Sequence, residues 1–476
     1  MDKTSLKHFF ELNCKPSASE RSGQKLGPEY ECMVLIPDRE DSSGQSYRPL
    51  GMDEHDGVPK VLRNFKEVAS NQGEVWKEKF EGENLIGLQS QDGAKITIEP
   101  GGQIELSDHP MDNLSQLEIS IRNFVRNLKD CISTINGRLM FLGAQPLHNL
   151  DEIPLSPKKR YRIMYRHMPK VGSLGQWMMK ATAGCQLSLD YASIEDLERK
   201  FRIICRLSPF LTAIFSNSPL HLGKPSGYKS FRGHIWQCTD ETRSGIPESF
   251  ISRKFKIEDY IDWALSASPY HLNRQGEIHE LMDHSFKDLI SGSHPKIKTN
   301  FEDWKEHLGM LFPEIRIKNI IEIRSIDAIN PEYVLAVPAL LQALIYDETA
   351  FGKLESILMD LPENEFPWYQ QVAARDGLAG QVNQVNFSKF CKNLVEMALE
   401  NLNLSEGCAL ALFFDDYTRH GISPADLVLD RYFSIDKNAL TLSWIDEELR
   451  SDEAKQSSFI NFPCDFHEKS ISLVQN

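Results

Sequence analysis

Two glutamates flank a Pro-Gly-Gly turn in the segment KITIEPGGQIELS, which runs from Lys95 to Ser107. The run on each side of the turn alternates apolar and polar residues, and each carries one of the two, Glu99 or Glu105. A hairpin between such runs holds its carboxylates on either side of one tight turn. Neighbouring carboxylates repel one another, and their oxygens are ligands that Mg²⁺ prefers. The segment therefore predicts a hairpin that presents Glu99 and Glu105 to metal.

Further segments alternate with a period of two and pair one apolar side with one strongly polar side. Their polar sides carry Glu29 and Glu31; Gln186, Ser188 and Asp190; and Arg316, Lys318, Glu322 and Arg324. An antiparallel sheet with one face on a helical layer produces this pattern. A single polar face of this kind is typical of a strand that meets water. If all the strands share one sheet, however, their carboxylates gather on one surface, where Mg²⁺ ions would hold a nucleotide.

Positive groups for phosphate chemistry lie in two other segments. PKKRYRIMYRHMPKVGSLGQWMM contains Lys170, and GYKSFRGHIWQCTDETRSGIPE contains Arg232 and Arg243. Phosphoryl transfer needs such groups to balance developing charge, although either segment alone is also typical of a basic surface region. The chain lacks GxxxxGK[ST], GxGxxG, GxSxG and HExxH. A P-loop ATPase and a Rossmann dehydrogenase are therefore disfavoured.

Helical patterns separate these strands. Apolar residues at helical spacing predict an amphipathic helix over residues 112–136, and a capping-box pattern at Ser193 and Asp196 starts one or two more. VPALLQALIYDE and FSKFCKNLVEMALENL are later helices, and the turn-rich stretch from Pro37 to Gly57 reads as a loop. The helices would form the layer on which the apolar sides of the strands pack.

Composition narrows the class of protein. The 476 residues are 41% hydrophobic and 25% charged, which suits a soluble globular chain, and a net charge of −15 disfavours binding to nucleic acid. No apolar run approaches the roughly 18 residues that span a membrane, and the N-terminal segment lacks the apolar region of a targeting peptide. The nine cysteines show no zinc spacing, which suggests reduced thiols. We expect a cytoplasmic protein that binds neither nucleic acid nor membrane.

Taken together and in this order, the segments resemble the glutamate–cysteine ligases of the plant and proteobacterial type. KLGPEYE is similar to that family's Ile-Gly-x-Glu-x-Glu strand, and EPGGQIELS to its Glu-Pro-Gly-Gly-Gln-x-Glu-Leu-Ser hairpin. MPKVGSLG, SFRGHIW, LFPEIRIKNIIEIRSID and LPENEFPWYQQVAARDGL also follow the family's order. The resemblance covers roughly Leu26 to Tyr432.

The resemblance implies an α+β fold similar to the glutamine synthetase catalytic domain. In this fold a curved, mainly antiparallel sheet forms a funnel-shaped active site, with helices packed on its back face. We expect a catalytic domain over residues 21–440, an N-terminal extension over 1–20 and a C-terminal tail over 441–476. The implied reaction joins the γ-carboxylate of L-glutamate to the amino group of L-cysteine through a γ-glutamyl phosphate, with Mg²⁺ and ATP, in a monomer or homodimer.

The resemblance also implies roles for individual residues. The carboxylates at the metal positions are Glu29, Glu31, Glu99, Glu105 and Glu322. The residues at the nucleotide positions are Glu29, Glu31, Gln186 and Arg324. The catalytic arginines are Arg232, Arg316 and Arg324, and the substrate-binding residues are Arg232, Arg243, Lys170, Gln186 and Ser188. Arg232 is suited to holding the α-carboxylate of glutamate with two hydrogen bonds.

Several positions depart from the family pattern. Ser188 replaces a larger amide, Ser325 and Ile326 replace small residues in the usual Arg-Gly-Ala-Asp, and Asp108-His109 replaces Gly-Ala after the hairpin. These changes leave the proposed carboxylates and Arg232 in place, but they fall near the substrate side. Three readings therefore stay open: a glutamate–cysteine ligase, a ligase that uses another amine or another carboxylate, and a paralogue that binds a nucleotide or a protein without turnover.

Overall fold

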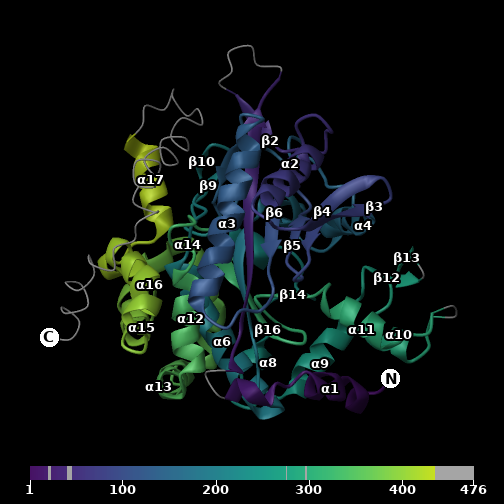
Figure 1. Cartoon of the computed structure of the whole chain (residues 1–476). Coiled ribbons are helices and arrows are strands. Elements are labelled where there is room, and N and C mark those ends of the chain that lie inside the picture. The colour runs from purple at the N-terminus through teal and green to yellow at the C-terminus, as the bar shows by residue number, and fades with distance from the viewer. Residues whose placement is uncertain (20–22, 40–45, 275, 295–296, 435–476) are drawn as a thin grey trace.

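A computed structural model describes residues 1–19, 23–39, 46–274, 276–294 and 297–434, and its centre is a ten-stranded sheet (Figure 1). Eight strands run in the order β15-β16-β8-β1-β6-β5-β4-β3, and β2 and β7 both pair with β1. Every neighbouring pair in this sheet is antiparallel. The strands are β1 (Leu26–Pro37), β2 (Tyr47–Pro49), β3 (Trp76–Glu81), β4 (Asn84–Ser90), β5 (Lys95–Ile98), β6 (Ile104–Ser107), β7 (Arg138–Met140), β8 (Gly184–Leu189), β15 (Ile315–Ile317) and β16 (Ile321–Asp327).

Short strand pairs and helices complete the fold. The small pairs are β9 (Leu220–His221) with β10 (Lys224–Pro225), β11 (Ser244–Gly245) with β14 (Phe312–Pro313), β12 (His271–Arg274) with β13 (Glu277–Glu280), and β17 (Gln381–Val382) with β18 (Val385–Asn386). The helices are α1 (Lys3–Leu12), α2 (Val58–Asn71), α3 (Leu114–Ser133), α4 (Lys159–His167), α5 (Gly175–Ala181), α6 (Ile194–Ile214), α7 (Phe231–Gln237), α8 (Glu248–Ile251), α9 (Ile257–Ser266), α10 (Phe286–Ile290), α11 (Phe301–Leu308), α12 (Ala336–Tyr346), α13 (Glu348–Met359), α14 (Phe366–Asp376), α15 (Phe387–Leu399), α16 (Leu404–Asp416) and α17 (Pro424–Ser434).

The alternation of the strands decides which face of the sheet is buried. Tyr30, Ile96, Leu187 and Ile323 point to the same side and belong to one large apolar core. Helix α6 packs behind β15 and β16, while α2 and α3 lie against the other half of the sheet. Helices α15–α17 gather on one side of the molecule, and α9–α11 with β12 and β13 on the other (Figure 1). The predicted antiparallel sheet with helices on its apolar face is confirmed.

Some predictions of local structure are confirmed and one is partly wrong. The hairpin is confirmed, since Thr97 pairs with Glu105 across β5 and β6. A single helix, α6, follows Ser193, whose side chain accepts a hydrogen bond from the backbone N–H of Asp196. The stretch from Pro37 to Gly57 is not all loop, because its described part contains β2.

The first twenty residues contain a helix that packs into the main core. Leu6 and Phe10 of α1 are fully buried, and the backbone carbonyl of Phe10 accepts a hydrogen bond from the Tyr191 hydroxyl. The predicted tail over 441–476 lies outside the described residues. None of the helices in the described ranges has both the length and the apolar composition to cross a bilayer.

Candidate active site

The polar sides of five adjacent strands meet on the face of the sheet opposite the core. Across β1 and β6, Glu31 lies directly opposite Glu105, and across β1 and β8, Glu29 lies opposite Gln186. Across β15 and β16, Glu322 lies opposite Arg316. Side chains directly opposite one another in antiparallel strands point to the same face. The five strands therefore carry one continuous polar strip.

One part of this strip, which we call the acidic end, consists of Glu29, Glu31, Glu99 and Glu105. Its carboxylates accept hydrogen bonds only from neutral groups. Glu31 accepts from the backbone N–H of Gly184 (2.6 Å), Glu105 from the hydroxyls of Thr97 (3.0 Å) and Ser107 (2.9 Å), and Glu99 from Tyr161 (3.2 Å). Within the described ranges, no lysine, arginine or histidine forms an ion pair with any of the four. The negative charge at this end has no internal counter-charge in direct contact.

The electrostatic consequence is a raised pKa at three of the four positions. Burial, followed by the charges of Glu105 and Glu322, raises the pKa of Glu29 to about 7. Burial and the neighbouring glutamates also raise the pKa of Glu31 and of Glu105. Burial beside like charges thus disfavours the negative charge of these groups, and a cation placed among them would favour it.

The opposite part of the strip, the basic end, consists of Arg316, Lys318, Glu322 and Arg324. Glu322 is almost fully buried, and its Oε1 accepts from Arg316 Nη2 at 2.9 Å while its Oε2 accepts from Arg316 Nε. Lys318 and Arg324 lie 3.5 and 3.4 Å from its oxygens. Burial disfavours the charge of Glu322, but the three cations outweigh burial and hold its pKa well below the usual range.

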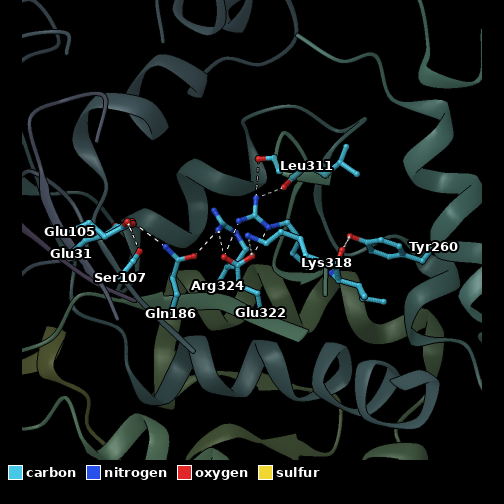
Figure 2. Close-up of polar contacts among 12 residues, drawn as sticks. Glu31, Glu105, Ser107, Gln186, Tyr260, Leu311, Lys318, Glu322 and Arg324 are labelled. Carbon is cyan, nitrogen blue, oxygen red and sulfur yellow. Dashed lines mark hydrogen bonds and ion pairs between the residues drawn. The ribbon is translucent and has the colours of Figure 1, made fainter. Parts of the chain in front are cut away.

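Gln186 joins the two ends. Its Nε2 donates to Glu31 Oε1 (3.1 Å), and its Oε1 accepts from Arg324 Nη1 (2.6 Å). Figure 2 shows this amide between the glutamates of β1 and β6 on one side and the Arg324–Glu322 pair on the other. Because one amide contacts a carboxylate and a guanidinium, it keeps the two charged groups apart and fixes their relative positions.

The Pro-Gly-Gly turn positions the acidic end through close backbone contacts. A side chain at Gly101 would lie 2.0 Å from the carbonyl oxygen of Lys180, and Gly102 has a φ of +82° that favours glycine. Gln103 then donates to the carbonyl of Thr182 (2.8 Å) and accepts from the N–H of Gly101 (2.8 Å). The EPGGQ motif therefore attaches the hairpin to the segment that leads into β8.

Arg232 on α7 approaches the strip beside Gly184, the first residue of β8. A Cβ at position 184 would lie 2.6 Å from Arg232 Nη2, so only glycine leaves room for the guanidinium. Nη2 donates to the carbonyl of Arg324 (2.8 Å), and Nη1 lies 4.0 Å from Asp327. Asp327 in turn accepts hydrogen bonds from the hydroxyls of Ser218 (2.7 Å) and Ser230 (2.8 Å). These contacts fix the position of Arg232.

A cavity of about 720 Å³ lies over the strip. Its floor is the sheet, and its walls come from α4, α5, α7, α11 and the β12–β13 hairpin. The sequence-predicted residues that line it are Glu29, Glu31, Glu99, Glu105, Gln186, Arg232, Arg316 and Arg324. A cavity of this size accommodates a nucleotide-sized ligand.

Comparison with known proteins identifies the family. A family model described as glutamate-cysteine ligase family 2 (GCS2) matches residues 25–454. The chain belongs to this glutamate–cysteine ligase family. It is 34% identical to a glutamate–cysteine ligase named chloroplastic from Nicotiana tabacum, over 75% of this chain and 69% of that protein. It is 31% identical to glutamate–cysteine ligase B, chloroplastic, from Oryza sativa, over 91% and 84% respectively.

A solved structure is also similar, at a lower sequence identity. A glutamate–cysteine ligase from Francisella tularensis in complex with AMP aligns over 95% of this chain and 98% of that chain, at 12% identity and a TM-score of 0.44. This similarity is too low to bear on the arrangement of the site, whose geometry rests on the contacts above.

Four residues that the family resemblance suggested do not line the cavity: one is Glu322, whose contacts are given above, and the other three are the proposed substrate-binding residues Lys170, Ser188 and Arg243. Lys170 is exposed in the turn that follows α4, and Ser188 is half-buried between Gly27 and Glu322 in the sheet. Arg243 is buried, pairs with Asp240 at 2.7 Å, and lies over the Tyr270 ring at 4.0 Å. Their assignment to substrate therefore gains no support from proximity to the strip.

Some site residues of this glutamate–cysteine ligase family member were not among the sequence predictions. Tyr161 contacts Glu99, Trp236 lies on α7 within 6.0 Å of the Arg232 guanidinium, and Asp327 lies beside Arg232. Trp236 follows Arg232 by four residues, a spacing that places both on one side of a helix. The contact partners of Tyr161 and Asp327 lie far away in sequence, so no local pattern indicates them.

The acidic end fits a divalent cation in its donor chemistry. In the described ranges, no three His, Cys, Asp or Glu side chains are arranged as a complete ion cage. Mg²⁺ in nucleotide sites commonly takes only one or two carboxylates and fills its octahedron with phosphate oxygens and water. Glu29, Glu31, Glu99 and Glu105 can supply such partial coordination. Glu322 already contacts three cationic side chains, so a metal there would displace at least one of them.

Proposed function

We propose that the protein is an ATP-dependent ligase that joins the γ-carboxylate of L-glutamate to the amino group of L-cysteine. The observation that carries the proposal is the polar strip, in which carboxylates without internal cations lie across Gln186 from arginines at the basic end. Such a surface supports transfer of a phosphoryl group to a carboxylate, because that reaction needs charge neutralisation and alignment rather than a protein nucleophile.

In the first step, the γ-carboxylate of glutamate attacks the γ-phosphorus of ATP. The bond from phosphorus to the β,γ-bridging oxygen breaks, ADP leaves, and a γ-glutamyl phosphate forms. We propose that Arg232 holds the α-carboxylate of glutamate and that Arg324 stabilises the transferred phosphoryl group. Arg324 contacts Gln186 and Glu322 through Nη1 alone, and its other N–H groups have no partner in the described structure.

In the second step, the amino group of the acceptor attacks the γ-carbonyl carbon, and inorganic phosphate leaves as the amide forms. Arg316 directs its side chain to Glu322 and to the carbonyls of Gly309 (3.2 Å) and Leu311 (2.9 Å). We therefore assign Arg316 to holding Glu322 and the basic end in place. Its direct contact with substrate remains a prediction from the family resemblance.

We propose that Glu29, Glu31, Glu99 and Glu105 hold Mg²⁺ together with the phosphates of ATP. When bound, Mg²⁺ neutralises phosphate charge and polarises the γ-phosphate. The carboxylates themselves orient the ion, and Thr97, Ser107 and Tyr161 orient the carboxylates through hydrogen bonds. A metal role for Glu322 remains a weaker proposal because of its three cationic partners.

The decisive experiment measures ADP release by the purified full chain with Mg-ATP and L-glutamate, while L-cysteine and other amines are added one at a time. We expect cysteine to give the largest rate and the mass of γ-glutamylcysteine as product. No ADP release with cysteine, together with clear release with another amine, would change the proposed acceptor and leave the proposed ligase activity in place. ADP release that never depends on glutamate or on any amine would overturn the proposal.

The predictions of a cytoplasmic location and of a monomer or homodimer are separate from the chemistry. Relatives from Nicotiana tabacum and Oryza sativa are named chloroplastic. Cell fractionation and light scattering of the purified protein test these two points directly.

A further inference from the structure

An irregularity in β16 directs one extra side chain toward the site. Ile323 pairs with Leu187, but the next core residue is Ile326, which pairs with Cys185. Three residues of β16 therefore span the length of two on β8, as in a β-bulge. The extra residue is in the Arg324–Ser325 segment, so Ser325 does not occupy an ordinary position on the core side of the strand.

Ser325 borders a small pocket behind the main cavity, which we call the rear pocket. Its volume is about 20 Å³, enough for one oxygen-sized atom. The lining residues are Thr212, Arg232, Gly233, Trp236, Phe312, Pro313, Glu314, Arg324 and Ser325. Arg232, Trp236, Phe312 and Arg324 also line the main cavity, so the two spaces adjoin.

Three polar groups at the rear pocket are buried and have no hydrogen-bond partner in the described structure. They are Nε of Arg232, Nε1 of Trp236 and Oγ of Ser325. Ser325 is 5% exposed and Arg232 is 3% exposed, so water in bulk does not satisfy these groups. Leaving a buried polar group unpaired costs roughly 1–3 kcal/mol, and all three groups belong to residues that line one small space, so an oxygen that accepts hydrogen bonds suits it.

The charges around the rear pocket favour an anionic oxygen. The guanidiniums of Arg232 and Arg324 lie 6.0 and 5.6 Å from the Trp236 ring. Glu314 also lines the pocket, but its two carboxylate oxygens accept from Gln370 Nε2 (3.1 Å) and from the Ser208 hydroxyl (2.5 Å). Glu314 is thus held by its own donors, while the unpaired N–H groups remain available to a substrate.

We propose that the rear pocket receives one oxygen of the α-carboxylate of the amino acid substrate, and that Ser325 with Trp236 adds substrate contacts to those of Arg232. The proposal rests on the function proposed above and adds to it the residues that recognise the substrate's α-carboxylate. The hydroxyl of Ser325 would donate to that oxygen beside the indole N–H. The bulge at Arg324–Ser325 is the feature that makes this contact available.

The test compares two ligands that differ in the α-carboxylate. L-glutamate carries it, and 4-aminobutyrate keeps the reacting carboxylate but lacks the α-carboxylate. We expect Ser325→Ala and Trp236→Phe each to raise the dissociation constant of glutamate by about tenfold, measured by calorimetry with an ATP analogue and Mg²⁺. The same variants should leave the affinity for 4-aminobutyrate unchanged, because that ligand has no α-carboxylate to place in the rear pocket.

The melting temperature of the variants is a second measurement, and a purely structural role of Ser325 would give a different result. Removing an unpaired buried hydroxyl removes an unfavourable burial, so Ser325→Ala without ligand should melt no lower than the wild type. Ser216→Ala is the matched control, since Ser216 is also buried and its hydroxyl contacts Ala213 and Ser423 away from both cavities. That control should lose stability and keep glutamate affinity.

Equal weakening of glutamate and 4-aminobutyrate by Ser325→Ala would overturn the proposal, as would a tenfold effect of the Ser216 control on glutamate. If the wild type binds no glutamate at all, the proposed function itself fails, and that outcome is visible before any variant is compared.

Discussion

The acidic end and the basic end lie on the same face of one sheet, yet their carboxylates have opposite kinds of contact partner. At the basic end, one buried carboxylate contacts three cations from its own strand, the neighbouring strand and the turn between them, and its pKa falls. At the acidic end, glutamates contact hydroxyls, an amide and a backbone N–H, and the pKa of three of them rises. The carboxylate of the basic end finds its counter-charges within the protein, whereas in the proposed function the carboxylates of the acidic end take theirs from a bound cation.

The largest expected effect comes from Glu322→Gln, which removes the single negative charge from the basic end. Arg316, which is buried, and Lys318 and Arg324, which are half-buried, would then lie beside one another without a counter-charge. We expect the free energy of unfolding to fall by about 3–5 kcal/mol, as when one partner of a buried ion pair is lost, with turnover lost as well. Urea denaturation measures the stability.

Glu258→Gln is the control for this change, because Glu258 pairs with Lys7 at the partly exposed surface (2.7 Å) and should contribute at most about 1 kcal/mol. Equal stability of the two variants would mean that the basic end does not depend on its carboxylate.

At the acidic end, Glu31→Gln should separate activity from stability. Burial and the neighbouring glutamates raise the pKa of Glu31, so an uncharged amide removes repulsion and breaks no ion pair. We expect the melting temperature without Mg²⁺ to be maintained, while turnover with Mg-ATP falls by about 100-fold. Glu78→Gln, in a surface pair with Lys66, should change neither quantity. A large loss of stability in Glu31→Gln would contradict the contrast between the two ends.

A smaller effect should follow from Gly184→Ala, which tests whether Arg232 depends on the space beside β8. The new Cβ would lie 2.6 Å from Arg232 Nη2, so the guanidinium must move away from its present position. We expect the KM for glutamate to rise by about ten- to thirtyfold with a smaller change in kcat. Gly352→Ala is the control, since its Cβ would meet nothing within 4 Å. Unchanged KM would remove Arg232 from the glutamate site.

The smallest effect concerns a group that is neutral rather than charged. Burial lowers the pKa of His307 to about 3, and its Nε2 donates to the carbonyl of Ala264 (2.7 Å). At His307 the unfolded chain binds a proton near pH 6.5 and the folded chain does not, so this group alone lowers stability as the pH decreases from 6.5 to 5. Glu29, with a pKa of about 7 in the folded chain, acts in the opposite direction. The slope is at most about 1.4 kcal/mol per pH unit.

The difference in stability between the wild type and His307→Gln isolates the histidine: the wild type should lose stability relative to the variant as the pH decreases over this range, as measured by denaturation at each pH. Because the pKa of Glu322 lies below the usual range of carboxylates, the basic end should contribute nothing between pH 6.5 and 5. If the variant and the wild type show the same change of stability with pH, the change comes from another group that titrates between pH 6.5 and 5, such as a glutamate of the polar strip.

The sheet, the hairpin and most of the strip could be predicted because they depend on local alternation. Glu29 and Glu31 are two residues apart on one strand, and apolar residues on the other face show which side is buried. Lys170 and Arg243 were assigned from residue type within a matched segment, and residue type alone does not show whether a side chain faces the cavity. The contacts of Arg232 with Gly184 and Asp327 join distant segments, and no sequence spacing indicates them.

The bulge in β16 could be predicted from the sequence only in part. Isoleucine occurs at positions 321, 323 and 326, so the change of phase is visible in the sequence. Its effect on Ser325 becomes clear only from the pairing with β8.

This bulge makes one residue of β16 dispensable for the sheet. Deleting Ser325 would restore strict alternation, because Ile326 would keep its partner Cys185 on β8 and Asp327 would keep its present face. A variant that lacks Ser325 should therefore fold while it loses the extra hydroxyl, and denaturation of this variant measures that outcome.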